Sequence, residues 1–314
     1  MATLLDYRRR IRSVKSTQQI TRAMKFVAAA KLRRAQEGVF AARPYAREIL
    51  RVMRSAAARI ENPEHPLLER RPEEKVLTLV LTGDRSLCGA FNTNVLRRAG
   101  QFLREQQSKS QSSQLMVIGK KGRDTLKKRG YDFAGEYLGI SSNVEFSAAK
   151  EIAGKITQMY ANREIDAVYA VYNEFKNVLV QKLQVQKLLP IDPAVLTEAA
   201  AEKEIAVSDA SDEANLPHDL APSGKGFIVD YIYEQPVDEL FSGLVPRYLE
   251  SEIFRILLES AAAEHAARMT AMDSATRNAA DLIDRLTLEM NKIRQAGITK
   301  ELIEIVSGAA SAMS

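Results

Sequence analysis

Residues 4–60 read LLDYRRRIRSVKSTQQITRAMKFVAAAKLRRAQEGVFAARPYAREILRVMRSAAARI, and this stretch decides the fold. Apolar or small residues recur along it at alternating gaps of three and four, which is the spacing of a coiled-coil seam. The seam positions are Leu4, Tyr7, Ile11, Val14, Leu32, Ala35, Val39, Ala42, Ala46, Ile49, Met53, Ala56 and Ile60. A periodic segment of this length far exceeds the ~8–20 residues of an ordinary globular helix. It predicts one helix of roughly 85 Å that needs a partner helix.

Two features modify this expected helix. Pro44 lies inside it, and because the period continues beyond the proline, the sequence predicts a kink rather than an end. In the middle of the segment the seam positions become polar, and the apolar stripe moves to Ile20, Met24 and Val27. This shift predicts a change of packing partner partway along the helix.

A second helical segment follows Pro246 and runs from Arg247 to Met313, roughly 100 Å. Its seam consists of Leu249, Ile253, Ile256, Met272, Ala275, Ala279, Leu282, Leu286, Ile293 and Ala296. The alanine-rich stretch 261–271 within it allows a close approach of two helices. Helices of this length at opposite ends of one chain predict an antiparallel pair, with the remaining domain at one end of the rod.

The chain between the two helices alternates strands and helices. Strand-like segments are 76–82, 115–118, 133–138, 167–173 and 178–188, and helix-like segments are 92–107, 121–129 and 148–161. This alternation predicts a Rossmann-like α/β domain with a mostly parallel sheet and helices on both faces. The last strand alternates apolar and polar residues, which favours an antiparallel or edge position.

Three segments fall outside this alternation. Residues 61–75 hold three prolines and are expected to be a linker, and residues 106–114 are expected to be a loop. Residues 194–226 hold seven acidic residues, two lysines and no aromatic residue, which predicts a flexible acidic insertion, followed by a strand over 227–233. The predicted division is therefore an N-terminal helix over 1–60, an α/β domain over 76–245 and a C-terminal helix over 246–314.

The charge of the chain is unevenly distributed. Residues 1–60 hold 15 basic and three acidic residues, a net +12, whereas the remainder holds 30 basic and 37 acidic residues, a net −7. A basic arm on a mildly acidic body predicts a polyanionic partner, such as nucleic acid, an anionic membrane or an acidic protein surface. No apolar run approaches the ~18 residues needed to cross a membrane.

The sequence offers no strong catalytic, metal or cofactor site. Cys88 is the single cysteine, so neither an internal disulfide nor a cysteine-based metal cluster can form, and the three histidines show no ligand spacing. The dinucleotide and Walker phosphate-binding patterns are absent. We therefore expect no catalytic residue, no metal and no cofactor.

Two short segments remain as weak alternatives. Gly119-Lys120-Lys121-Gly122 follows a strand and opens a helix, so it is either an anion cradle or a tight turn with solvated lysines. Thr82–Asn92 ends the first strand, where α/β proteins bind ligands. In it Cys88 is either a thiol of lowered pKa or a small buried side chain, and Asp84 is an acid catalyst, an ion-pair partner of Arg85 or a helix cap.

Both ends of the chain resemble one family. Residues 11–36, IRSVKSTQQITRAMKFVAAAKLRRAQ, resemble the N-terminal helix of gamma subunits of F-type ATP synthases. Residues 291–310, NKIRQAGITKELIEIVSGAA, resemble that family's C-terminal signature. Residues 82–89, TGDRSLCG, and the Arg43-Pro44-Tyr45 kink are also similar to family features. The resemblance covers nearly the whole chain except 194–226.

The resemblance implies a central rotor that does no bond chemistry. Its terminal helices would form an antiparallel coiled coil inside a ring of three alpha and three beta subunits, and its domain would join the epsilon subunit and the membrane c ring. Proton flow would turn the rod, which would drive the catalytic beta subunits through different affinities. The resemblance also implies a bacterial chain, peripheral on the cytoplasmic side of the inner membrane, with no membrane insertion and no nucleic acid.

The same resemblance implies contact residues for the beta subunits. They are Met24, Lys25, Arg33, Arg34, Arg294, Gln295 and Thr299. Gln295 and Thr299 are one turn apart and share a helix face.

The alternative function is a basic coiled-coil adaptor that binds nucleic acid or an anionic membrane. It follows from the basic arm alone. Nucleic-acid readers usually interleave basic residues with stacking aromatics, whereas residues 1–60 hold only Tyr7, Phe26, Phe40 and Tyr45.

Overall fold

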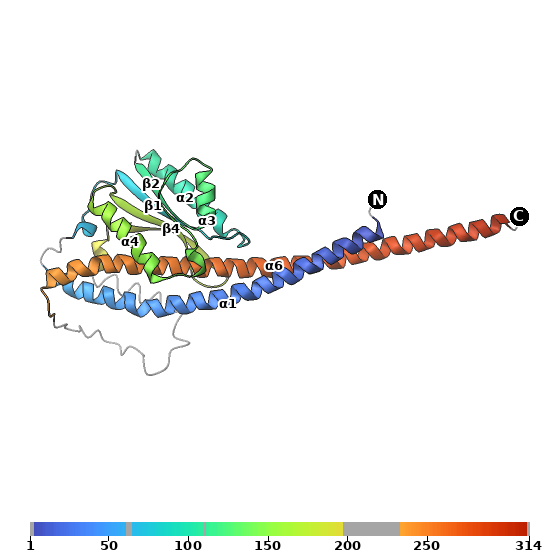
Figure 1. Ribbon diagram of the computed structural model, residues 1–314, viewed down its shortest axis with the longest axis horizontal. Coiled ribbons are helices and arrows are strands. Elements are labelled where there is room, and N and C mark those ends of the chain that lie inside the picture. Colours follow the sequence, from blue (N-terminus) through green and yellow to red (C-terminus); the bar gives the residue numbers. More distant parts are fainter. Residues whose placement is uncertain (1–2, 61–64, 110, 197–232, 313–314) are drawn as a thin grey trace, which may run out of the picture.

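The computed structural model describes residues 3–60, 65–109, 111–196 and 233–312 of the chain. Two very long helices lie side by side and antiparallel, and an α/β domain sits against one end of the pair (Figure 1). This arrangement confirms the rod and domain that the two periodic segments predict.

Helix α1 spans Leu4–Ala57. A capping box fixes its start: Thr3 Oγ1 accepts the N–H of Asp6 at 3.3 Å, and the Asp6 carboxylate accepts the N–H of Thr3 at 2.9 Å. These bonds satisfy amides that a helix start otherwise leaves unpaired. The helix continues through Pro44, as its period predicts, and ends three residues before the expected Ile60.

Helix α6 spans Val237–Ala312, so it begins before Pro246 and not after it. The expected start after Pro246 is wrong, because this proline lies inside the helix. Phe241, Leu244 and Val245 are buried in the core of the domain. Their burial holds the first turns helical and offsets the hydrogen bond that a proline inside a helix removes.

The seam between α1 and α6 beside the domain is built partly from small residues. Leu32 lies against Ala262 and Ala266. Gly38 approaches α6 so closely that a Cβ there would lie 3.2 Å from Cδ2 of Leu258. The alanine-rich stretch thus allows the close approach expected of it.

Farther from the domain, α1 and α6 still pack against each other, but the residues between them become polar. Thr21 is buried, and its Oγ1 accepts a hydrogen bond from Thr276 Oγ1 at 2.8 Å. Ile20 and Val27 are more than half exposed. The partner of α1 therefore does not change within the chain, and the displaced apolar stripe faces away from α6.

Beyond the start of α1, helix α6 continues alone (Figure 1). Tyr7, at the end of the first turn of α1, lies close enough to Glu289 of α6 for that carboxylate to raise the pKa of the Tyr7 hydroxyl. Residues 294–312 therefore extend past the end of the pair by about 28 Å. We call this segment the overhang. Its exposed apolar side chains are Ile298, Leu302, Ile303, Ile305 and Val306.

The domain is built on one five-stranded sheet in the order β3-β2-β1-β4-β5. The strands are β1 (Lys75–Leu81), β2 (Ser112–Ile118), β3 (Phe133–Tyr137), β4 (Ala167–Phe175) and β5 (Gln181–Leu189). The first four are parallel, and β5 is an antiparallel edge strand, as its alternating pattern predicts. The helices are α2 (Phe91–Ser108), α3 (Lys120–Lys127) and α4 (Phe146–Ala161), with 3-10 turns η1 (Pro66–Leu68), η2 (Ile140–Ser142) and η3 (Pro193–Leu196).

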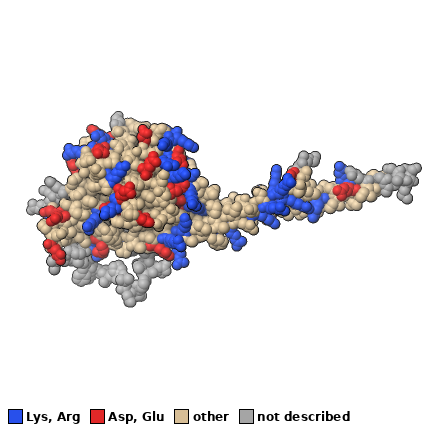
Figure 2. All heavy atoms as spheres, in the orientation of Figure 1, with Lys and Arg blue, Asp and Glu red and all other residues tan. Residues whose placement is uncertain are grey.

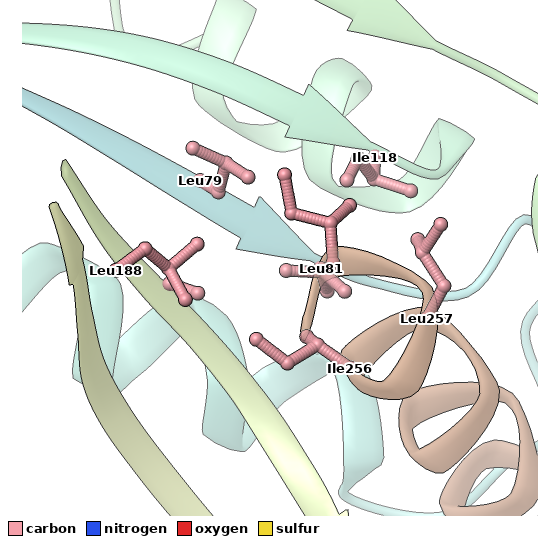
Figure 3. Close-up of a pocket in the computed structure, with 8 residues that line it drawn as sticks. Leu79, Leu81, Ile118, Leu188, Ile256 and Leu257 are labelled. Atoms are coloured by element: carbon pink, nitrogen blue, oxygen red, sulfur yellow. The ribbon is translucent and has the colours of Figure 1, made fainter. Parts of the chain in front are cut away.

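Helices cover both faces of the sheet. On one face, Val80 and Val117 of the strands lie in a core with Val95 of α2 and Leu126 of α3. The opposite face belongs to a second core shared with α4 and α6. There Leu79, Leu81, Ile118 and Leu188 of the strands surround Ile256 and Leu257 of α6 (Figure 3). The rod is therefore part of the domain's own core.

Two loop-like segments contain more structure than their composition predicts. The expected loop 106–114 holds the end of α2 and the start of β2, because Ser112–Gln114 pair with Lys75–Leu77 through backbone bonds that polar side chains do not prevent. The expected linker 61–75 contributes Leu67, which is fully buried in the core that faces the rod.

The expected acidic insertion lies almost wholly outside the described residues. Only residues 194–196 fall inside them, in η3. The expected strand over 227–233 also lies outside, apart from Tyr233. That residue belongs to no strand, and its hydroxyl donates to Ser55 Oγ of α1 at 2.8 Å.

Candidate functional site: the rod surface and its joint with the domain

The predicted contact residues form two separate groups along the rod. Met24, Lys25, Arg33 and Arg34 lie on α1, and Arg294, Gln295 and Thr299 lie on the overhang. Lys25 lies beside Asp273 of α6, so the two groups are about 30 Å apart along the rod. The structure therefore places them at two heights rather than in one site.

Lys25 has a partner within the chain. Its Nζ donates to Oδ1 of Asp273 at 2.6 Å, and the other carboxylate oxygen of Asp273 accepts from Arg277 at 2.8 Å. The hydrogen bond from Lys25 lowers the pKa of Asp273. An ion pair that is accessible to water contributes little to stability. Any outside partner of Lys25 has to share or displace Asp273.

The neighbouring arginines are more accessible. Arg33 makes one exposed ion pair with Glu37, a turn farther along α1, at 3.0 Å. Arg34 is exposed, and Met24 is half-buried. Together with the outward-facing Phe26, these side chains give the middle of α1 a mixed basic and apolar surface. Beyond the domain, the rod surface is mostly uncharged with groups of Lys and Arg side chains on it (Figure 2).

The three overhang residues are all exposed. The hydroxyl of Thr299 donates to the backbone carbonyl of Gln295 at 3.0 Å. Its hydrogen is therefore used within the helix, and only its oxygen can accept from outside. Gln295 presents its side-chain amide beside it on the same face.

The turn after β1 joins the domain to α3. The first amides of α3 donate to groups of residues 82–84: Lys120 to Asp84 Oδ1 at 3.0 Å, Lys121 to the Gly83 carbonyl at 3.2 Å and Gly122 to Thr82 Oγ1 at 2.8 Å. These bonds use the amides that an anion cradle would need, so of the two alternatives for residues 119–122 the structure supports the tight turn. Asp84 is therefore a helix cap, one of the alternatives that its position allowed.

The same turn also touches the rod. A Cβ on Gly83 would lie only 2.6 Å from the carboxylate carbon of Glu264 on α6, so a larger residue there would force that carboxylate to move. Glu264 is buried and accepts from Arg268 Nη2 at 2.6 Å. Burial raises the pKa of Glu264, while Arg268 acts in the opposite direction. Sequence reasoning missed this contact, although the i, i+4 spacing of the two residues inside an alanine-rich helix was a signal for it.

Cys88 lies at the same contact and is not activated. It is buried, and Nδ2 of Asn92 donates to its Sγ at 3.2 Å. Burial raises the pKa of the Cys88 thiol, with the charge of Glu264 acting in the same direction. The alternative of a lowered pKa is wrong, because the thiol is buried in an apolar cluster with Phe91 and Ala263 of α6, and this burial outweighs the opposing charge of Arg268.

Neither a metal site nor a membrane span emerges from the described ranges. Among these residues, no cluster of three or more histidine, cysteine, aspartate or glutamate side chains is arranged to hold a metal ion. Within the same ranges, every helix is too polar or too short to cross a bilayer.

Comparison with known proteins gives one consistent family. A family model described as ATP synthase matches residues 3–312. The ATP synthase gamma chain of Solibacter usitatus is 48% identical over 316 residues, covering 99% of this chain and all of the relative. The ATP synthase gamma chain of Pelotomaculum thermopropionicum is 47% identical over 311 residues, covering 99% of both chains.

Solved structures with the same fold are more distant in sequence. A chain of the Euglena gracilis mitochondrial ATP synthase, in a structure of its OSCP, F1 and c ring, has a TM-score of 0.63 at 20% identity, covering 99% of this chain and 94% of that one. A chain of the Tetrahymena thermophila central stalk and c ring has a TM-score of 0.56 at 23% identity, covering 82% and 99%. These likenesses confirm the fold, and none of the matches supports a nucleic-acid adaptor.

Proposed function

The chain belongs to the ATP synthase gamma-chain family and is a central rotor subunit of that synthase. From this premise we propose a role for each of its parts. The α1–α6 rod turns inside a ring of alpha and beta subunits. The α/β domain meets the epsilon subunit and the membrane c ring, which drive it. The chain itself performs no bond chemistry.

The overhang carries this proposal. Its five exposed apolar side chains lie on a helix with no partner in the described chain, and Ile305 is 67% exposed. An exposed apolar surface of this kind marks an interaction site. At 3.6 residues per turn the five side chains fall within roughly one half of the helix circumference. The inner wall of a ring of subunits that encloses the end of the rod would cover this face.

The middle of α1 suits contact with acidic loops of the beta subunits. Ile20, Phe26 and Val27 face outward and supply apolar area. Arg33 and Arg34 add exposed positive charge close to them, whereas Lys25 already has Asp273 as a partner. We therefore assign the charge contact mainly to the two arginines and treat Lys25 as a residue that the partner shares with Asp273.

The face of the domain that surrounds the emerging rod also presents apolar side chains. Leu87 follows β1, and Leu179 and Val180 form the turn after β4, so all three lie at the carboxyl ends of the strands. Leu179 is 83% exposed. In an assembled synthase this face is directed toward the ring of alpha and beta subunits.

A non-catalytic role agrees with the way the domain uses the backbone amides at the start of α3. Nucleotide-binding α/β proteins use free backbone amides at the start of a helix to hold phosphate. Here the corresponding amides of α3 are bound to Thr82, Gly83 and Asp84. We therefore place the ATP-binding sites of the complex on its other subunits.

We also propose a place in the cell. The full-length relatives named above come from bacteria, which favours the cytoplasmic side of a bacterial inner membrane. Contact with the c ring would hold the chain there as a peripheral protein.

Purification of the tagged chain from solubilised membranes tests this function. We expect the alpha, beta and epsilon subunits and the c ring to accompany it, together with ATPase activity. Replacing Leu302 and Ile305 with Asp should reduce the recovered alpha and beta subunits, while Arg97→Asp on the outer face of α2 should not. Recovery of nucleic acid or lipid without alpha and beta subunits would overturn the proposal.

A further inference from the structure

A buried polar network surrounds Arg255 of α6. Its Nε and Nη2 donate to the two carboxylate oxygens of Glu252 at 3.2 and 2.8 Å, and its Nη1 donates to Glu259 at 2.9 Å. The three side chains are 13–28% exposed, so they are largely removed from water. All three belong to one helix, and by themselves they attach nothing to the domain.

Gln186 of β5 connects this group to the sheet. Its Oε1 accepts from Arg255 Nη2 at 3.2 Å and from the hydroxyl of Tyr172, on β4, at 2.9 Å. Its Nε2 donates to Glu252 at 3.2 Å. One amide is thus bonded to two side chains of the rod and to the neighbouring strand.

The apolar contact between the same elements is larger but different in kind. Leu188 of β5, with Leu79 and Leu81 of β1, surrounds Ile256 and Leu257 of α6 (Figure 3). Apolar burial resists separation of the two surfaces, but it is non-directional, so a small slide that keeps the surfaces covered costs little. Hydrogen bonds weaken steeply once the angle at the hydrogen falls below about 120°. The Gln186 network therefore resists the sliding that the apolar core permits.

We propose that Gln186, through Arg255 and Glu252, is the positioning residue that prevents the sheet from slipping on α6 while torque crosses the joint. The inference rests on the proposed function, because torque crosses this joint only if the domain is driven and the rod does the work. Under that load the directional bonds hold the angle between the domain and the rod. Without them, part of each rotation is lost as slip.

The test is the double variant Tyr172→Phe/Gln186→Met in the complete synthase. Both changes nearly conserve volume, and Arg255 keeps its bonds to Glu252 and Glu259, so no buried charge is left alone. Gln184→Met is the matched control. It makes the same change on the same strand, but the amide of Gln184 donates to Glu174 of β4, within the sheet, at 2.8 Å.

We would measure protons pumped into membrane vesicles per ATP hydrolysed, the melting temperature and the subunit content. The double variant removes all three hydrogen bonds of the Gln186 amide. It should hydrolyse ATP normally and lower the pumping ratio by at least the roughly two- to tenfold that the loss of one hydrogen bond produces. The control should keep the wild-type ratio, and all three complexes should melt alike.

The possible outcomes distinguish a failure of this inference from a failure of the proposed function. If the wild-type complex lacks alpha and beta subunits or does not pump, the proposed function fails. If the wild type pumps and the double variant matches it, the role of Gln186 is overturned. An equal loss in the control, or loss of assembly in the double variant, also overturns it, because the network would then serve the fold alone.

Discussion

The ring of His65 lies close to the backbone carbonyl of Ser242, four residues before Pro246. That carbonyl would normally accept the N–H of residue 246, and proline has none. Nδ1 of His65 accepts the N–H of Leu67 at 3.1 Å, so in the neutral ring Nε2 carries the proton and is the nitrogen that can donate to the Ser242 carbonyl. Burial lowers the pKa of His65 and favours the neutral ring that both bonds require. A side chain ahead of β1 thus replaces the donor that α6 lacks.

The first prediction tests this replacement. His65→Leu leaves the Ser242 carbonyl without a donor and should lower the free energy of unfolding by about 1–3 kcal/mol, measured by urea denaturation of the full chain. In a Pro246→Ala background the helix supplies its own N–H, so the same substitution should cost clearly less. The loss of the Leu67 bond is common to both backgrounds and cancels in the comparison. Equal costs in the two backgrounds would contradict the relationship.

A methyl group on Gly83 should weaken the joint between the domain and the rod. The added Cβ would meet the buried carboxylate of Glu264, whose movement is restricted by Arg268. We expect Gly83→Ala to destabilise the chain by about 1–3 kcal/mol, by the same physics as overpacking a core. Gly154→Ala on α4 is the control, because its Cβ meets nothing within 4 Å, and it should be neutral or stabilising. Similar melting temperatures for the two variants would show that the contact at Gly83 relaxes freely.

Stability should fall as the solution becomes acidic, through His265. Burial, with the nearby charges of Arg268 and Lys31, lowers the pKa of His265 from 6.5 to about 4. Between these values the unfolded chain binds a proton that the folded chain does not, so stability is full above pH 6.5 and falls toward pH 4. The loss at the end of this window is about 3 kcal/mol.

Comparison with His265→Gln isolates this effect. The raised pKa of Glu264 acts in the opposite direction, but that residue is present in both proteins. The difference in unfolding free energy between the wild type and the variant should therefore change between pH 6.5 and 4 and be constant above pH 7. A difference independent of pH would mean that the His265 ring takes up its proton equally in the folded and unfolded chains.

On the overhang, Gln295 should contribute more to coupling than Thr299. The Thr299 hydroxyl already donates to the Gln295 carbonyl, whereas the Gln295 side chain is exposed and extends outward. Gln295→Ala should lower ATP-driven proton pumping roughly two- to tenfold without loss of assembly, because one hydrogen bond is removed and alanine keeps the helix. Thr299→Ala should have a smaller effect. Normal pumping by both variants would show that these positions are solvated in the assembled rotor.

The large features of the fold could be predicted because they rest on local periodicity. The 3-4 spacing over residues 4–60 does not depend on anything distant in the chain, and the structure confirms a single helix there. The antiparallel edge position of β5 was readable from its alternation for the same reason. The start of α6 could not be predicted, because its first turns depend on burial in the domain and on His65, nearly 180 residues earlier in the chain.

The joint could not be predicted for a related reason. Gln186 and Arg255 are 69 residues apart, and each is an ordinary polar residue in its own segment. Their meeting requires the register of β5 on β4 and the rotation of α6 about its axis, and neither is encoded locally. The same holds for Gly83 and Glu264. The proposed beta-subunit contacts rest on a family resemblance. For one of these residues, Lys25, the structure shows an ion pair within the chain, to Asp273.

The unequal lengths of α1 and α6 have a mechanical consequence. Beside the domain the shaft is two helices thick and is embedded in a core, whereas the overhang is one helix. Resistance to bending rises steeply with thickness, so a sideways load deflects the last 28 Å, roughly, far more than the base. Elastic deformation would thus be concentrated near the C-terminal end, where the shaft can bend, and the two-helix base would rotate as a nearly rigid body.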